Sequence, residues 1–165
     1  MALYFTSNTN ITTPSQQNLS SSFKTMSGVW SKAAASGVTN SRAFIYEFEV
    51  GTSGTPNATD CAVQWDIQAC TTTGTGVTMN VQPLDPADTA ASHDNFANST
   101  AEGTTTANSQ RWAFSANQRA SYRWVVNPGG PGELVVVSAA SNGLILRAKS
   151  ATYASTADAS IYFRE

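Results

Sequence analysis

Charged side chains are scarce in this chain: Asp, Glu, Lys and Arg make up only 12% of its 165 residues. Nine lysines and arginines face eleven acidic residues, which leaves a net charge of -2. Such a balance cannot neutralise a nucleic-acid backbone, because that requires clustered cations. No apolar run approaches the roughly 20 residues that span a bilayer, and no basic amphipathic helix is visible. We therefore expect neither a nucleic-acid partner nor a membrane partner.

The residues that carry reactive chemistry are equally few. The chain has one histidine, His93, and two cysteines, Cys61 and Cys70. Neither the ligand spacing of a zinc site nor the motif of a nucleophilic hydrolase is present. The first residues lack the features of a secretory signal, which indicates synthesis in a cytoplasm. We expect a solvated His93, two reduced and partly buried thiols, and no catalytic residue, metal or cofactor.

The acidic residues offer two weaker possibilities. Residues 85–88, Asp-Pro-Ala-Asp, lack the ligand density of a calcium loop, so we expect a turn with Asp caps there. A glycosidase needs only two carboxylates. Glu47, Glu49 and Asp66, however, alternate with the apolar positions of their own strands, which predicts a surface that faces solvent or another subunit. Glu102 has no recognisable partner in the sequence.

Small hydroxyl and amide side chains are abundant: serine, threonine and asparagine supply 53 of the 165 residues. Within this background, Phe44, Tyr46, Phe48 and Val50 recur at every second position, a period of two that indicates a half-buried strand. The pattern predicts strands at about residues 42–50, 61–69, 76–82, 98–106, 110–116, 119–127, 133–139, 143–149 and 158–164. Turn residues separate them. We expect a mainly β domain at residues 42–165, built as an antiparallel β-sandwich or a jelly roll.

Residues 1–41 differ from the rest and predict an N-terminal arm. Leu19, Phe23 and Met26 recur at spacings of four and three, which indicates one short amphipathic helix at about residues 15–26. An arm of this kind can extend over a neighbouring molecule. The following apolar residues of the arm are therefore candidates for contact with a partner protein or another subunit: Leu3, Tyr4, Phe5, Leu19 and Phe23.

The segment 117–126 combines arginines with aromatic residues. In a strand, its aromatic residues share one face, and Arg119 and Arg123 share the other. The two arginines are then placed to pair with Glu47 and Glu49, or with acids of a neighbouring subunit. An interface and an ordinary solvated face both fit this pattern. We expect the four tryptophans of the chain to lie in the core, with stacking on sugars as the alternative.

Five groups of residues carry a resemblance to a known class of proteins: 2–5, 50–56 with 64–66, 83–88, 117–125 and 142–153. Together they resemble small virion proteins of tailed bacteriophages. The resemblance implies a capsid decoration, or cement, protein: a β-rich homotrimer that binds the outer capsid surface and holds capsomers together against the pressure of packaged DNA. Its partners would be the major capsid protein and its own copies. It would be made in the host cytoplasm and reside on the virion.

Two other functions stay open. A phage tail or head-fibre protein that binds a host surface glycan would be present in few copies and would expose aromatic platforms. A small carbohydrate hydrolase would need a cleft with two close carboxylates. We do not expect an enzyme.

Overall fold

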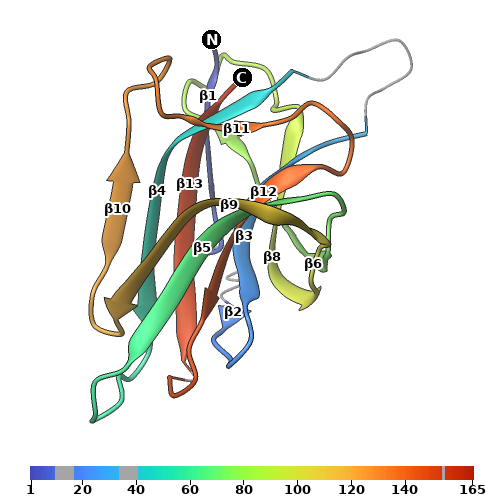
Figure 1. The fold of residues 1–165 in the computed structure, drawn as a ribbon. Helices are drawn as coiled ribbons and strands as arrows, with labels where there is room; N and C mark the ends of the chain where they lie inside the picture. Colours follow the sequence, from blue (N-terminus) through green and yellow to red (C-terminus); the bar gives the residue numbers. More distant parts are fainter. Residues whose placement is uncertain (10–16, 34–40, 154) are drawn as a thin grey trace.

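Residues 1–9, 17–33, 41–153 and 155–165 are described in the computed structural model of the chain. They form two antiparallel β-sheets that pack face to face, and they contain no helix (Figure 1). The expectation of a mainly β chain built as an antiparallel sandwich is therefore confirmed.

One sheet has seven strands. They are β1 (Leu3–Ser7), β2 (Gln17–Asn18), β4 (Ala43–Ser53), β7 (Gln82–Pro83), β10 (Tyr122–Val125), β11 (Leu134–Val136) and β13 (Thr156–Arg164). Their order is β10-β4-β13-β1-β7, with β11 beside β4 and β2 beside β13. The neighbouring strands β1 and β13 of this sheet thus come from opposite ends of the sequence.

The other sheet has six strands. They are β3 (Lys24–Ser31), β5 (Ala62–Cys70), β6 (Thr75–Met79), β8 (His93–Ala101), β9 (Thr105–Asn117) and β12 (Gly143–Lys149). Their order is β6-β8-β3-β12-β5-β9, which leaves β6 and β9 as edge strands.

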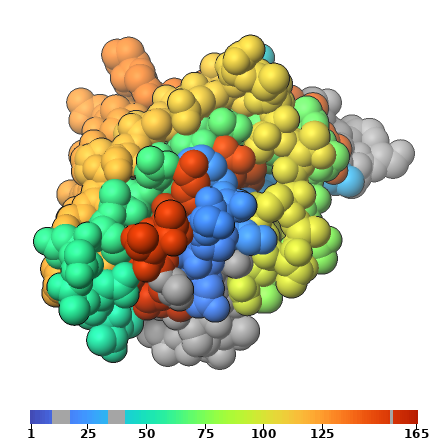
Figure 2. Space-filling model, turned by 60° about the horizontal axis from the view of Figure 1, so that its bottom comes forward, coloured from blue at the N-terminus to red at the C-terminus, as the bar shows by residue number. Residues whose placement is uncertain are grey.

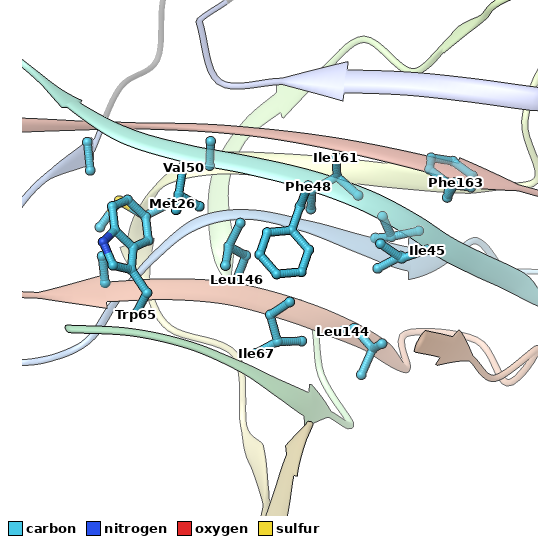
Figure 3. Packing of buried hydrophobic residues seen from close by; sticks show 14 of the residues in the cluster. Met26, Ile45, Phe48, Val50, Trp65, Ile67, Leu144, Leu146, Ile161 and Phe163 are labelled. Carbon is cyan, nitrogen blue, oxygen red and sulfur yellow. The ribbon is translucent and has the colours of Figure 1, made fainter. Parts of the chain in front are cut away.

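Apolar side chains from both sheets meet between the layers (Figure 3). The seven-stranded sheet contributes Ile45, Phe48, Val50, Ile161 and Phe163, and the six-stranded sheet contributes Met26, Trp65, Ile67, Leu144 and Leu146. Period-two alternation along the strands directs these side chains inward. Full burial of one such side chain contributes about 1.5–3 kcal/mol, so this core is the main source of the stability of the sandwich.

The predicted helix at 15–26 is wrong wherever the structure describes it, because residues 24–31 form β3. Residues 15 and 16 of that prediction lie outside the described residues. β3 is paired on both sides, with β12 and with β8. Its residues from Thr25 to Ser31 are all buried, so tertiary pairing overrides the helical spacing of the apolar residues.

The segment predicted as an arm is part of the sandwich in its described residues. β1 pairs with β13 at five successive positions and with β7 on its other side. β3 lies inside the opposite sheet. The boundary predicted at residue 41 therefore does not separate these strands from residues 42–165.

Several turns gather at one end of the sandwich. Figure 2 looks onto this end, where the segment before β3 (blue), the β4–β5 connection (green) and the β12–β13 connection (red) are drawn. The Ser150 amide donates to the carbonyl of Ser20 at 2.8 Å, and the Asn57 side-chain amide donates to the carbonyl of Thr152 at 2.8 Å. Hydrogen bonds between turns thus fix this end.

Candidate interaction surface

One edge of the seven-stranded sheet is built from two strands in line. β10 pairs with residues 47–50 of β4, and β11 pairs with residues 43–45 of the same strand. The loop between β10 and β11 interrupts this edge at the upper left of Figure 1. The loop contains Gly129 and Gly132 at φ of 82° and 101°, a backbone region that favours glycine. In the described part of the chain, no further strand pairs with the outer side of this edge.

Three valines of this edge are open to solvent. Val125 is 53% exposed, Val135 is 42% exposed, and Val137, just after β11, is 49% exposed. Val125 lies opposite Glu47, and Val135 lies opposite Phe44. Exposed apolar side chains beside unpaired backbone groups are typical of an interaction surface, because they favour pairing with another chain. We call β10, β11 and these three valines the valine edge.

A cluster of half-buried aromatic side chains adjoins the valine edge. Trp112 and Phe114 come from β9, and Tyr122 and Trp124 come from β10. The ring centroids of Phe114 and Tyr122 are 4.3 Å apart, and those of Trp112 and Tyr122 are 5.5 Å apart. Because β9 and β10 are edge strands of different sheets, this aromatic seam closes one open side of the sandwich. Tyr122 and Trp124 share one face of β10, as predicted.

The tryptophans divide into two pairs. Trp30 and Trp65 are buried, as expected. Trp112 and Trp124 are only half-buried, although both pack against the core. The prediction of four core tryptophans is thus confirmed for the first pair only, and the second pair adds apolar surface beside the valine edge.

Arg123 connects the valine edge to the outer face of the sheet. Its Nε lies 2.6 Å from Glu47 Oε1 and 3.4 Å from Glu49 Oε1. The hydrogen bond to Glu47, followed by the attraction of the carboxylates, raises the pKa of Arg123 above its usual value. The predicted pairing of Arg123 is confirmed, and both signs of charge lie close to the apolar side chains.

Arg119 does not join this group. It precedes β10 in a turn, where its Nε lies 3.2 Å from Asp60 Oδ1 and its Nη2 donates to the carbonyl of Asn57 at 2.9 Å. The predicted pairing with Glu47 or Glu49 is therefore wrong for this arginine. The reason is that β10 begins at Tyr122, so the two-residue alternation does not extend back to Arg119.

The arm residues proposed for contact lie in different places. Tyr4 and Leu19 are buried in the core and are not available to a partner. Leu3 and Phe5 are half-buried in β1, and Phe5 packs 4.9 Å from the ring of Tyr162 in β13. Two strands, β13 and β4, separate β1 from the valine edge, so these residues and Arg123 do not form one compact site.

Phe23 lies on a different sheet surface. The Arg147 guanidinium is 4.7 Å from the centre of its ring, and the Lys149 ammonium is 4.6 Å from it. Arg147 also forms a bidentate pair with Asp66, with Nε–Oδ1 at 2.9 Å and Nη2–Oδ2 at 2.6 Å. Asp66 is thereby buried, and Glu47 is buried as well. The surface position predicted for these two acids is wrong because arginine side chains accompany them, whereas Glu49 is exposed as expected.

The remaining candidates for chemistry are engaged in structural contacts. Asp85 caps a turn as predicted, with its Oδ1 accepting from the amide of Ala87 at 2.9 Å. Glu102, for which the sequence indicated no partner, accepts hydrogen bonds from the amide and hydroxyl of Thr25. Both cysteines are free thiols, as expected. Burial raises the pKa of Cys70, although Trp30 Nε1 donates to its sulfur at 2.9 Å.

His93 is not solvated, contrary to the prediction. It is 0% exposed, and its Nδ1 lies 2.9 Å from Glu165 Oε1. Among the residues that the structure describes, no group of three or more His, Cys, Asp or Glu side chains could hold a metal ion. Within the same residues, no helix has the length and apolar character to cross a membrane.

Sequence reasoning missed the valine edge itself. Residues 134–137 form an unbroken apolar run, Leu-Val-Val-Val, which is the pattern of a strand buried on both faces. The two prolines and three glycines of residues 127–132 indicate a loop before this run, but no local signal showed that the strand lies at a sheet edge.

No protein-family model, curated protein or solved structure shows a significant match to the chain.

Proposed function

We propose that the chain is a structural virion protein of the capsid decoration, or cement, type. In this proposal it binds the outer capsid surface as a homotrimer and stabilises capsomer contacts against internal DNA pressure. The observation that carries the proposal is the valine edge: three exposed valines on a sheet edge that no other strand of the described residues covers. A clamp of this kind acts through contact area, for which such an edge is suited.

Each valine of the valine edge can contribute a small free energy of binding, so attachment through this edge needs several contacts. Covering one half-exposed valine contributes about 1 kcal/mol, roughly half of the value for full burial. A trimer places three copies of each contact on one particle site, so a weak single contact becomes a strong overall attachment through avidity. In a closed threefold assembly, the edge of one copy meets a different surface of the next copy.

Internal ion pairs keep the rest of the surface nearly neutral. Arg164 forms a bidentate pair with Glu133, and Arg147 forms one with Asp66. Lys24, Lys32, Arg119 and Arg123 also have acidic partners within 4.0 Å. With a net charge of only -2, identical copies repel one another weakly, which favours dense packing on a shell.

A pair of matched variants tests this function. Val125→Asp combined with Val135→Asp introduces two charges into the valine edge, and Val77→Asp introduces a charge at an exposed valine of β6, which is 37% exposed. We expect the double variant to lose the trimer and, with it, the avidity of attachment to purified particles that lack the chain, whereas Val77→Asp still co-sediments with them. Equal co-sedimentation of both variants would exclude the valine edge as the interface between copies that attachment requires.

A second candidate function is adhesion to a host glycan as a tail or head-fibre protein. A pocket of about 310 Å³ favours it, lined by Ser21, Ala62, Gln64, Lys149, Ser150, Ala151 and Thr152. Amide and hydroxyl groups of this kind suit the hydroxyls of a sugar. Binding of the chain to a glycan array, with loss of the signal in Gln64→Ala, would favour adhesion over shell attachment.

A further inference from the structure

The side chain of Glu165, directly after β13, is the acceptor of a dense group of hydrogen bonds. Its carboxylate is only 9% exposed. The Ser92 amide donates to both carboxylate oxygens at 3.0 Å, and the Ser92 hydroxyl donates at 2.9 Å. The Ser41 hydroxyl adds a bond at 3.3 Å, and His93 Nδ1 lies at 2.9 Å. Several hydrogen-bond donors around one carboxylate compensate the free-energy cost of burying its charge.

His93 is completely buried, but only one of its two ring nitrogens has a hydrogen-bond partner within the described part of the chain. Nδ1 faces the Glu165 carboxylate, whereas Nε2 is the one buried side-chain nitrogen or oxygen without a hydrogen-bond partner in the described residues. The Phe163 ring packs against the imidazole, with centroids 6.1 Å apart. Glu165 is thus the acidic partner of the imidazole among the residues that the structure describes.

The carboxylate joins the two sheets. Glu165 extends β13, a central strand of the seven-stranded sheet, whereas His93 is the first residue of β8 in the six-stranded sheet. Residues 84–92 cross from one sheet to the other and end at Ser92. Loss of the carboxylate would thus release the end of this crossing segment and the start of β8.

The electrostatics favour the ionised carboxyl. Burial opposes the charge, but hydrogen bonds from His93 and Ser92 outweigh it and hold the pKa of Glu165 below its ordinary value of 4.5. The neighbouring charged or titratable groups are the Tyr4 phenol of β1, Asp88 in the crossing segment, and the ion pair of Lys32 with Asp94 at 3.2 Å. Asp94 follows His93 in β8, and its side chain is 39% exposed.

We propose that Glu165, His93 and Ser92 form an acid-released latch between the two sheets. A proton from solvent binds the carboxylate and removes the anion that holds Ser92 and His93. The crossing segment 84–92 and the first residues of β8 then open while the rest of the sandwich stays folded. No other reactant takes part, and raising the pH closes the latch again.

Hydrogen exchange followed by mass spectrometry, corrected for intrinsic rates, tests the latch between pH 7 and pH 3. In the unmodified protein, we expect amides of residues 84–95 to lose protection selectively as the pH falls below about 4.5. The total loss of protection should be about tenfold for each pH unit by which folding lowers the pKa of Glu165. Glu165→Gln should show this loss already at pH 7 and little pH dependence. Asp94→Asn, an exposed acid of the same strand, should behave like the unmodified protein.

A milder variant keeps the test decisive if Glu165→Gln loses structure throughout the sandwich. Ser92→Ala removes one hydrogen bond to the carboxylate and leaves the backbone donor in place, so release should occur at a higher pH than in the unmodified protein. An unchanged pH profile in both Ser92→Ala and Glu165→Gln would overturn the proposal. Loss of protection throughout the sandwich at the same pH would also overturn it, because the latch opens locally.

Discussion

The valine edge exposes apolar side chains, whereas the corner around Glu165 buries polar ones. At the valine edge, Val125, Val135 and Val137 face solvent. At the other site, His93 and the carboxylate of Glu165 are buried. Apolar side chains are left in water where another surface can cover them, and polar side chains are buried where hydrogen bonds compensate the loss of water. The two regions show that departures from simple hydropathy mark the places with a specific role in this sandwich.

The largest effect on stability should come from removing the buried carboxylate. Glu165→Ala leaves the Nδ1 of His93 and the amide of Ser92 without their acceptor, and it should lower the free energy of unfolding by about 3 kcal/mol. Urea denaturation at pH 7 measures this change. Asp94→Ala is the control, with an expected change below about 0.5 kcal/mol. Equal losses in the two variants would show that burial of the carboxylate has no special importance.

The pH dependence of stability should follow the same carboxyl. Because the folded-state pKa of Glu165 is lowered, its stabilisation is fully present above about pH 4.5 and is lost as the pH falls through the folded-state pKa. The stabilisation that is lost is about 1.4 kcal/mol for each pH unit by which folding lowers the pKa of Glu165. The difference in unfolding free energy between the unmodified protein and Glu165→Gln should shrink over this range. A difference that stays constant down to pH 3 would contradict the assignment.

A single conservative change at the valine edge should affect assembly and not folding. Val135→Thr keeps the shape of the side chain and replaces a methyl group by a hydroxyl. We expect the dissociation constant for self-association to rise by about fivefold, equivalent to about 1 kcal/mol, with monomer stability within about 0.5 kcal/mol. Sedimentation equilibrium measures the first quantity. The matched change Val77→Thr should leave it unaltered; a similar rise there would indicate nonspecific association.

The smallest effect is expected at Arg123. This side chain is exposed, and water and salt screen its pairs with Glu47 and Glu49. Arg123→Gln should therefore leave the Tm of the isolated chain nearly unchanged at 0.15 M salt. If the valine edge is an interface, the same variant should make self-association less sensitive to salt. A large fall in Tm would instead place this pair among the structural contacts of the fold.

Sequence alone predicted the strands that are rich in apolar residues. The strand at 143–149 matches β12, whose first four residues are all buried, and the segment from Phe44 to Val50 lies within β4. The start of β8 was missed because its buried positions are occupied by polar residues, including His93 and Asn95. Asn95 Oδ1 accepts from the amide of Gly28 at 2.8 Å, a contact between distant segments that hydropathy cannot reveal.

The candidate surface was predictable to a similar extent. Alternation placed Arg123 on the same face as Glu47 and Glu49, and that pairing needed only the register of two strands. The exposure of Val135 and Val137 depends on where the sheet ends, which is a property of strand order and not of local pattern. The burial of Glu165 depends on a crossing segment more than 70 residues earlier in the chain, so local sequence could not indicate it.

The most direct test of the proposed function is the copy number of the chain in purified virus particles, measured against the major capsid protein by quantitative mass spectrometry. A decoration protein that clamps capsomers predicts a ratio near one or a simple fraction of one. A ratio of a few copies per hundred would favour a tail or fibre protein and contradict shell decoration. Complete absence of the chain from the particles would contradict both virion functions.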